Sequence, residues 1–165
     1  MAHLKFAEDI RLIIWDLDET FWHGTLTEGG IQYRQDCHDL VSTLNQRGVM
    51  SAICSKNDHT EIATALKAKG IWDQFIFPSI DWTAKGPRIA AMLGQIGLRP
   101  QSVLFIDDNP MNLAQAAEAA PGLNIAGPEV IPRLNTAPQL AGKNDLSLSR
   151  LGQYKIKEAK SHAEK

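Results

Sequence analysis

Short apolar runs alternate with segments of helical periodicity along the chain, and this alternation constrains the fold more than any other feature. A run that is apolar throughout is typical of a strand buried on both faces of a sheet. Strands of this kind that alternate with helices predict a parallel sheet covered on both sides. The expected fold is therefore α/β, with a three-layer, Rossmann-like sheet. The apolar runs lie at 10–16, 49–55, 75–77, 102–107 and 123–125.

The segments between the runs carry signals for the beginning and end of helices. Asp58 and Glu61 have the spacing of a capping box. Pro87 suits the first residue of a helix, and Asn109 suits a cap. Residues 19–35 are rich in glycine and predict a turn followed by a small hairpin. The expected helices run from 36 to 47, from 58 to 69, from 87 to the glycine at 97 and from 110 to 119.

Composition excludes several classes of protein. With 165 residues, the chain is long enough for one domain with a sizeable core. Its formal net charge of -2 gives no reason to expect nucleic acid as a partner. The first apolar run contains only LIIW before an aspartate, so we expect neither a signal peptide nor a membrane helix. Two cysteines form no disulfide framework or zinc pattern, which favours a reduced, cytoplasmic protein.

Polar residues gather where the expected strands end. In a parallel α/β sheet, function collects at the carboxyl ends of the strands, which meet at one edge. The first strand is followed by DLDET, the second by a serine and the fourth by two aspartates, and a lysine stands at a helix start that opens on the same edge. The residues that we expect at this edge are Asp16, Asp18, Ser55, Lys85, Asp107 and Asp108.

Several carboxylates close together need a compensating charge. A divalent cation provides it, and hard oxygen ligands favour Mg²⁺, which also binds phosphate groups. Lys85 adds a positive charge and Ser55 a hydroxyl donor, which together suit a phosphoryl group. One carboxylate could attack phosphorus and form an aspartyl-phosphate. Asp18, two residues after Asp16, is near enough to give and later take a proton.

Each of these residues also has an ordinary structural explanation. Asp16 and Asp18 could cap a turn, and Lys85 alone would fit a solvated surface lysine. Cys54 could suggest covalent chemistry, but a small buried strand residue explains it better. For Trp22 and His23, which lie in the expected hairpin segment, substrate contact, packing and simple exposure are all open.

Four motifs, taken in order, resemble those of the haloacid dehalogenase (HAD) superfamily. They are DLDET at 16–20, CSK around Ser55, WTAKGPRI with Lys85, and FIDDNP at 105–110. The resemblance implies a HAD fold in which Asp16 is the nucleophile and Asp18 the general acid/base. The substrate-binding residues that it implies are Thr20, Ser55, Lys56 and Lys85. The Mg²⁺ ligands that it implies are the Asp16 carboxylate, the Asp18 backbone carbonyl, Asp107, and Asp108 directly or through water.

A finer resemblance covers roughly residues 10 to 130. The stretches WDLDETFWHGTLTEGGI, AICSKND, FIFPSIDWTAKGPRI and VLFIDDNPMN look like subfamily IIIC, the branch that includes FkbH-like proteins. Those proteins are glyceryl transferase/phosphatase modules that work with acyl carrier proteins. Met111 and Asn112 depart from this pattern, because Glu and Arg stand there in many FkbH-like members.

The expected function is Mg²⁺-dependent hydrolysis or transfer of a phosphoryl group through an aspartyl-phosphate on Asp16. A first alternative is a glyceryl transferase/phosphatase component that loads an acyl carrier protein. A second alternative is a non-catalytic HAD-fold domain for binding or regulation. Asp18 and Lys85 argue against the second alternative, because a pure binding module needs neither residue.

The spacing between the motifs leaves little room for a cap domain over the site. From Thr20 to Asp36 there are 17 residues, and 29 residues lie between Ser55 and Lys85. We therefore expect a capless site with a small flap, which suits a substrate carried by a macromolecule or enclosed by a partner. The expected catalytic domain spans 1–140, and 141–165 form a helical tail or a linker to a further domain of the same protein.

Overall fold

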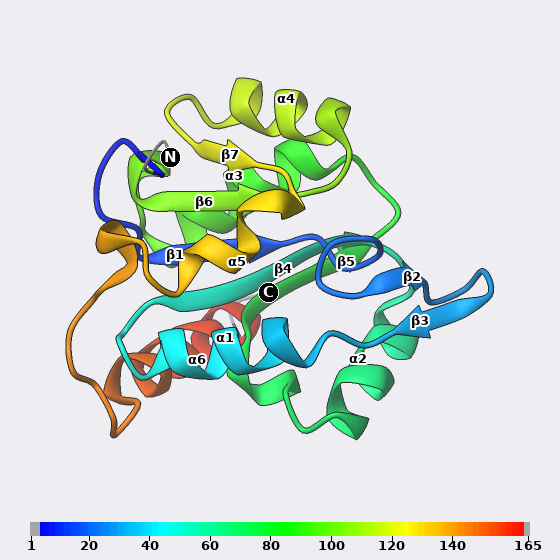
Figure 1. The fold of residues 1–165 in the computed structure, drawn as a ribbon, viewed down its shortest axis with the longest axis horizontal. Coiled ribbons are helices and arrows are strands. Elements are labelled where there is room, and N and C mark those ends of the chain that lie inside the picture. The colour runs from blue at the N-terminus through cyan, green and yellow to red at the C-terminus, as the bar shows by residue number, and fades with distance from the viewer. Residues whose placement is uncertain (1–3, 164–165) are drawn as a thin grey trace.

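A five-stranded, wholly parallel sheet forms the centre of the computed structural model, which describes residues 4–163 (Figure 1). The strand order β5-β4-β1-β6-β7 places the first strand of the chain in the middle. This arrangement confirms the expected α/β sheet. The strands are β1 (Leu12–Trp15), β4 (Met50–Lys56), β5 (Ile76–Asp81), β6 (Val103–Ile106) and β7 (Asn124–Ala126).

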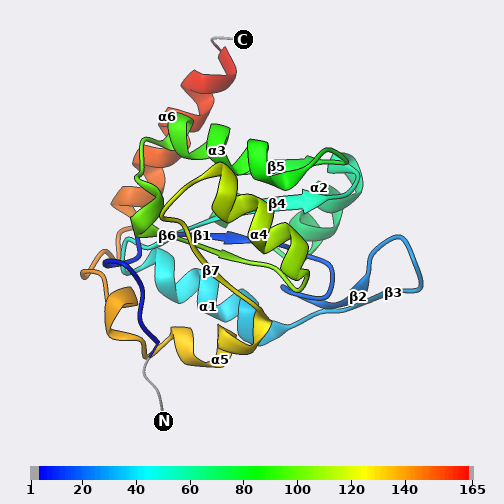
Figure 2. The ribbon, with the colours of Figure 1, turned by 90° about the horizontal axis from the view of Figure 1, so that it is seen from above.

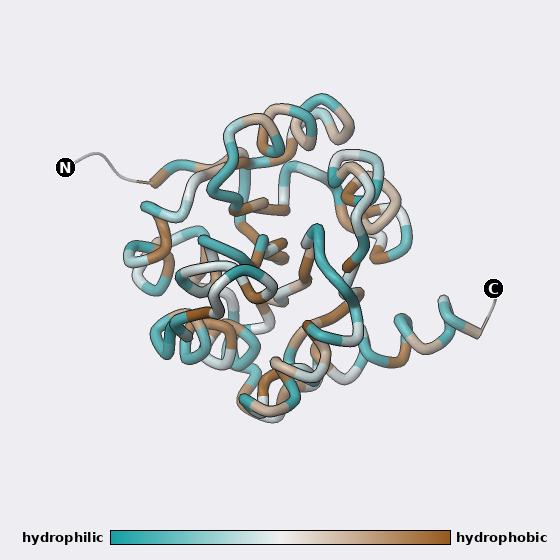
Figure 3. Tube along the Cα trace, turned by 90° about the vertical axis from the view of Figure 1, so that its right-hand side faces the viewer, coloured by the Kyte–Doolittle hydropathy of each residue, from teal (hydrophilic) through white to brown (hydrophobic). Residues whose placement is uncertain are grey.

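Helices cover both faces of the sheet, which confirms the three layers (Figure 2). Within β1, Ile13 and Trp15 face one apolar cluster, and Leu12 and Ile14 face the other. Hydrophobic strand segments lie in the middle of the molecule and hydrophilic segments mostly at its periphery (Figure 3). The helices are α1 (Gln35–Asn45), α2 (His59–Ala68), α3 (Lys85–Ile96), α4 (Pro110–Ala119), α5 (Ile131–Leu134) and α6 (Ser149–Ala163). Single 3₁₀ turns lie at Trp72–Gln74, Pro100–Ser102, Pro128–Val130 and Pro138–Leu140.

Two expected boundaries were wrong. Helix α3 begins at Lys85, so Pro87 is its third residue. A proline is tolerated there because the first four N–H groups of a helix have no partner within it. Strand β5 continues to Asp81 instead of ending at Phe77. It is an edge strand, where Pro78 costs no bond in the ladder, and the positive φ of Phe77, 47°, accompanies a register shift against β4.

The expected helix caps form at α2 and α4. The side chain of Asp58 accepts a hydrogen bond from the Glu61 N–H at 2.9 Å, as the capping box predicts. The return bond is different, because the Asp58 N–H donates to the side chain of Asn57 at 3.0 Å. At α4, the side chain of Asn109 accepts from the Met111 N–H at 2.9 Å.

The flap is a two-stranded antiparallel hairpin of β2 (His23–Thr25) and β3 (Gly30–Gln32). It projects from one end of the molecule (Figure 2). Gly24 has φ of 86°, and a Cβ there would lie 2.6 Å from the Gly30 carbonyl oxygen, so only glycine fits. Within residues 4–163, no cap domain is inserted after β1 or between β4 and α3.

The tail beyond residue 141 packs on the sheet layers. Leu151 of α6 is buried, and Tyr154 packs against the same apolar cluster as α3. Glu158 accepts from the Phe77 N–H at 2.6 Å, and Lys157 donates to the Ile96 carbonyl at 2.7 Å. The boundary at residue 140 stays a prediction. No helix of the described chain is long and apolar enough to cross a membrane.

Candidate active site

The expected site residues lie at the carboxyl edge of the sheet. The flap of β2 and β3 projects beside the same edge (Figure 1). Strands β1 and β6 pair in register, with Trp15 opposite Ile106. The next residue of each strand, Asp16 and Asp107, therefore leaves the sheet at the same level. Because both strands are four residues long and buried throughout, the first polar residue after each is forced to the edge.

Lys85 joins the two strand ends. Its ammonium nitrogen lies 2.7 Å from Oδ1 of Asp16 and 2.7 Å from Oδ2 of Asp107. The three residues are only 2%, 6% and 1% exposed, respectively. Charges buried to this degree are stable only when they are paired. The solvated-lysine explanation of Lys85 is thereby excluded, and the edge contains a preformed charged centre.

Three carboxylates converge in the arrangement that a hard cation needs. One oxygen from each of Asp16, Asp107 and Asp108 lies within 4.8 Å of the others. With all three carboxylates ionised and Lys85 charged, the group has a formal charge of -2. The donors are all oxygen and the charge matches a divalent ion, so the residues fit Mg²⁺. The Asp18 carboxylate lies outside this group, which agrees with the resemblance to the HAD superfamily only in that the resemblance implies the Asp18 backbone carbonyl as the ligand.

Burial sets the protonation of this centre. It raises the pKa of Asp16 to about 8; attraction to Lys85 lowers that pKa, and repulsion from Asp107 raises it. Burial lowers the pKa of Lys85, but the two carboxylates outweigh it and raise that pKa overall. Lys85 is therefore always charged near neutral pH. A cation bound beside Asp16 would favour its ionised form and lower its pKa.

Thr20 lies among the carboxylates. Its hydroxyl donates to Oδ2 of Asp16 at 2.8 Å, and it accepts from the Asp108 N–H at 3.1 Å. The residue is 1% exposed. This hydroxyl holds the two acidic segments together, and its assigned role in substrate binding stays a prediction.

The Asp18 carboxylate is held by three donors. Oδ1 accepts from the indole N–H of Trp22 at 2.8 Å and from the Leu26 N–H at 3.1 Å. Oδ2 accepts from the side chain of Asn57 at 2.9 Å. Of the three explanations open for Trp22, namely substrate contact, packing and exposure, its burial favours packing. His23 is exposed on the flap.

Ser55 and Lys56 end strand β4 in different environments. Ser55 is buried, and its carbonyl accepts from the Arg88 guanidinium at 3.2 Å. Lys56 is exposed on the rim of the site. Burial raises the pKa of the neighbouring Cys54 thiol to about 11, which favours the structural explanation of that residue.

Sequence reasoning missed three residues of this site. Asn57 binds Asp18, Asn112 donates to Oδ2 of Asp107 at 3.2 Å, and Arg88 ties the end of β4 to β5. Asn57 could have been found, because it stands directly after a strand end in the motif that contains Ser55. The contacts of Asn112 and Arg88 depend on side-chain directions that no local pattern specifies.

Comparison with known proteins reveals similarity at the level of structure. No family model matches the chain, and no curated protein is similar enough to count as a match. The structure resembles the N-terminal part of a Bacteroides fragilis protein that contains a phosphatase domain, complexed with Mg (TM-score 0.61, 20% identity). That match covers 89% of this chain and 41% of the other, so the chain spans about two fifths of the length of that N-terminal part.

Two further structures are similar over most of both chains. The cobalt-bound deoxy-D-mannose-octulosonate 8-phosphate phosphatase of Haemophilus influenzae has a TM-score of 0.58 and 17% identity, covering 94% of this chain and 92% of the other. A HAD-superfamily hydrolase of Ehrlichia chaffeensis has a TM-score of 0.55 and 15% identity, covering 73% and 87%. These likenesses show that the chain has the fold of HAD-superfamily hydrolases, while the finer resemblance to subfamily IIIC stays a prediction.

Proposed function

We propose that the protein hydrolyses phosphate monoesters with Mg²⁺ through an aspartyl-phosphate on Asp16. The observation that carries this proposal is the buried bridge that Lys85 forms between Asp16 and Asp107. A carboxylate oxygen of Asp108 lies beside this bridge, and hydrogen bonds fix Asp18, two residues after Asp16. The phosphatases among the proteins of the same fold support it.

In the first step, a carboxylate oxygen of Asp16 attacks phosphorus in line with the departing ester oxygen. The phosphorus–ester bond breaks as the new bond forms, and Asp18 gives its proton to the leaving alkoxide. The three hydrogen bonds on Asp18 keep its carboxyl group in one orientation for this transfer. In this proposal, Lys85 and Ser55 hold the phosphoryl oxygens.

In the second step, water attacks the phosphorus of the aspartyl-phosphate. Asp18, now ionised, takes a proton from that water, and the bond between phosphorus and the Asp16 oxygen breaks. Inorganic phosphate leaves and Asp16 is regenerated. Mg²⁺, held by Asp16, Asp107 and Asp108, would neutralise charge on the phosphoryl oxygens.

An open, apolar rim supports a large substrate. Trp82 and Met111 are 65% and 68% exposed, which is unusual for side chains of their size. Trp82 directly follows the last residue of β5, whose carbonyl accepts a hydrogen bond from the Asn57 N–H. Met111 directly precedes Asn112, whose side chain donates a hydrogen bond to Asp107. Trp82 and Met111 therefore border the site, and the described residues contain no cap domain that covers these two side chains. We propose that a macromolecule carrying the phosphate, or a partner domain, covers them.

The resemblance to FkbH-like modules supports a more specific version of this proposal. In it, the partner is an acyl carrier protein or an additional domain of the same protein, and the chain takes part in glyceryl transfer as well as phosphate release. A loading assay with a purified carrier protein, read by mass spectrometry, separates the two activities. A mass increase on the carrier indicates transfer, and phosphate release without it indicates a hydrolase.

The test of the general proposal is release of phosphate from p-nitrophenyl phosphate by the purified chain. We expect activity with Mg²⁺, loss of activity in EDTA and recovery when Mg²⁺ is restored. A folded chain that releases no phosphate from aryl or alkyl phosphates at any Mg²⁺ concentration would favour the non-catalytic alternative.

A further inference from the structure

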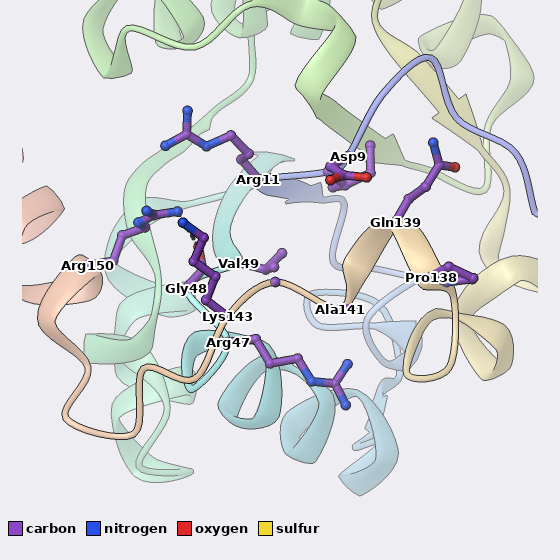
Figure 4. Close-up of a pocket in the computed structure, with 12 residues that line it drawn as sticks. Asp9, Arg11, Arg47, Gly48, Val49, Pro138, Gln139, Ala141, Lys143 and Arg150 are labelled. Atoms are coloured by element: carbon purple, nitrogen blue, oxygen red, sulfur yellow. Dashed lines mark hydrogen bonds between the residues drawn. The ribbon is translucent and has the colours of Figure 1, made fainter.

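A second candidate binding site lies at the opposite edge of the sheet. A cavity of about 320 Å³ opens at the amino ends of β1 and β4 (Figure 4). Its walls come from four parts of the chain, namely residues 9–11, residues 47–49, residues 138–143 and the first turn of α6. The proposed active site is at the carboxyl ends of the same strands, so the two sites are separate.

The cavity carries a concentration of positive charge. Four of its lining residues, Arg11, Arg47, Lys143 and Arg150, are cationic, and only Asp9 is acidic. The lining therefore has a formal charge of +3, although the whole chain has a net charge of -2. Like charges that share a cavity repel one another unless an anion compensates for them.

Hydrogen bonds hold the walls of the cavity in place. The side chain of Gln139 accepts from the Phe6 N–H at 2.7 Å and donates to the Phe6 carbonyl at 3.0 Å. The Ile10 N–H donates to the Gln139 carbonyl at 2.9 Å. On the other side, the Lys143 N–H donates to the Arg47 carbonyl at 2.9 Å. The cavity is therefore preformed, and a ligand does not have to order it.

The four cations fall into two groups, according to whether the structure gives their side chains a partner. The guanidinium of Arg47 donates to the Asn135 carbonyl at 2.9 Å, and that of Arg150 donates to the Gly48 carbonyl at 3.4 Å, so both have structural partners. Arg11 and Lys143 form no ion pair with any described residue. Figure 4 shows that these two side chains come from opposite walls of the cavity.

We propose that this cavity binds a small multivalent oxyanion of the phosphate class. Arg11 and Lys143 supply the unpaired charges, and Arg150 adds a third cation whose position the Gly48 carbonyl fixes. Guanidinium and ammonium groups form short, charge-assisted hydrogen bonds with phosphate oxygens. Two of the cations, Lys143 and Arg150, belong to the tail, so a bound anion would link the tail to the sheet.

Orthophosphate is the probe for this proposal. The full chain is titrated with sodium phosphate in EDTA, with sodium chloride at matched ionic strength as the reference, and both the thermal midpoint and calorimetric binding are measured. We expect phosphate to raise the midpoint more than chloride does. In Arg11→Gln and Lys143→Gln, we expect the phosphate affinity to fall by about tenfold or more, because each loses one charge-assisted contact.

Lys67→Gln is the matched control, because Lys67 is an exposed lysine in the last turn of α2, outside the cavity. It should bind phosphate as the unaltered chain does. Any phosphate bound at the active site in EDTA contributes equally to every variant, since none of them alters that site. Unchanged phosphate affinity in either cavity variant, or equal effects of phosphate and chloride, would overturn the proposal. The result does not depend on whether the protein is a phosphatase.

Discussion

The indole N–H of Trp22 donates to Oδ1 of Asp18 across 2.8 Å, so a buried residue at the start of the flap orients the proposed acid/base. Leu26, on the other side of β2, donates its backbone N–H to the same oxygen at 3.1 Å. The flap is therefore tied to Asp18 at two points. Its position and the orientation of the carboxyl group are expected to change together.

Replacement of this donor is the first prediction. Trp22→Phe keeps an aromatic ring but removes the N–H, so kcat for an alkyl phosphate should fall by about tenfold or more with little change in KM. Steady-state kinetics measure both constants. Trp72→Phe is the control, because Trp72 packs against the same apolar cluster but is not one of the donors to Asp18. Equal losses in the two variants would mean that Trp22 acts only through packing.

The second prediction concerns Asp18 itself. Asp18→Asn cannot donate the proton that an alkoxide leaving group needs, whereas nitrophenolate hardly needs one. General acid catalysis contributes about 10²–10⁴-fold, so the variant should lose far more activity on alkyl than on aryl phosphates. The ratio of kcat/KM values for the two substrates measures this. Similar losses on both substrates would show that Asp18 is not the general acid.

The third prediction concerns stability. Above pH 8, where Asp16 is ionised, Lys85→Ala leaves Asp16 and Asp107 buried without their shared counter-charge, which should lower the free energy of unfolding by about 3–5 kcal/mol in the absence of metal. Urea unfolding in EDTA measures the change, and Mg²⁺ should restore part of it. Lys56→Ala removes an exposed lysine from the same rim and should have almost no effect. Equal stability of the two variants would contradict the importance of the buried bridge.

The fourth prediction is that Mg²⁺ affinity depends on pH. Because the pKa of Asp16 is about 8 without metal, the residue carries a proton below that pH, and the cation must displace it. Affinity should therefore rise by up to about tenfold per pH unit as pH increases towards 8, and then level off. Calorimetry across this range measures it. Asp16→Asn should remove the dependence, and a flat profile in the unaltered chain would exclude a protonated Asp16.

The sheet and most helices could be predicted because their signals are local. The apolar run before Asp16 and the cap at Asn109 each depend on a few neighbouring residues. The end of β5 could not be predicted, because Pro78 resembles a strand terminator unless the strand is known to lie at an edge. The docking of α6 through Glu158 and the N–H of Phe77 joins residues 81 positions apart, which no local pattern shows.

In the candidate site, too, some features could be predicted from the sequence and others depend on long-range contacts. Topology alone brought Asp16, Asp107 and Lys85 to one edge, because the two aspartates follow strands that end there and the lysine begins a helix that starts there. The sequence could not show that Lys85 binds both carboxylates at once, or that Asn57 binds Asp18, since side-chain direction depends on long-range packing. The role of each residue in catalysis stays a prediction.

The central claim is that Asp16 carries the phosphoryl group during turnover. The most direct measurement is an acid quench during reaction with a radiolabelled phosphate ester in the presence of Mg²⁺, followed by detection of label on the chain. We predict label that resists acid, is released by hydroxylamine, and is absent in a folded Asp16→Asn variant that has also lost turnover. Normal phosphate release by Asp16→Asn, or turnover of the unaltered chain without any trapped label, would contradict the account.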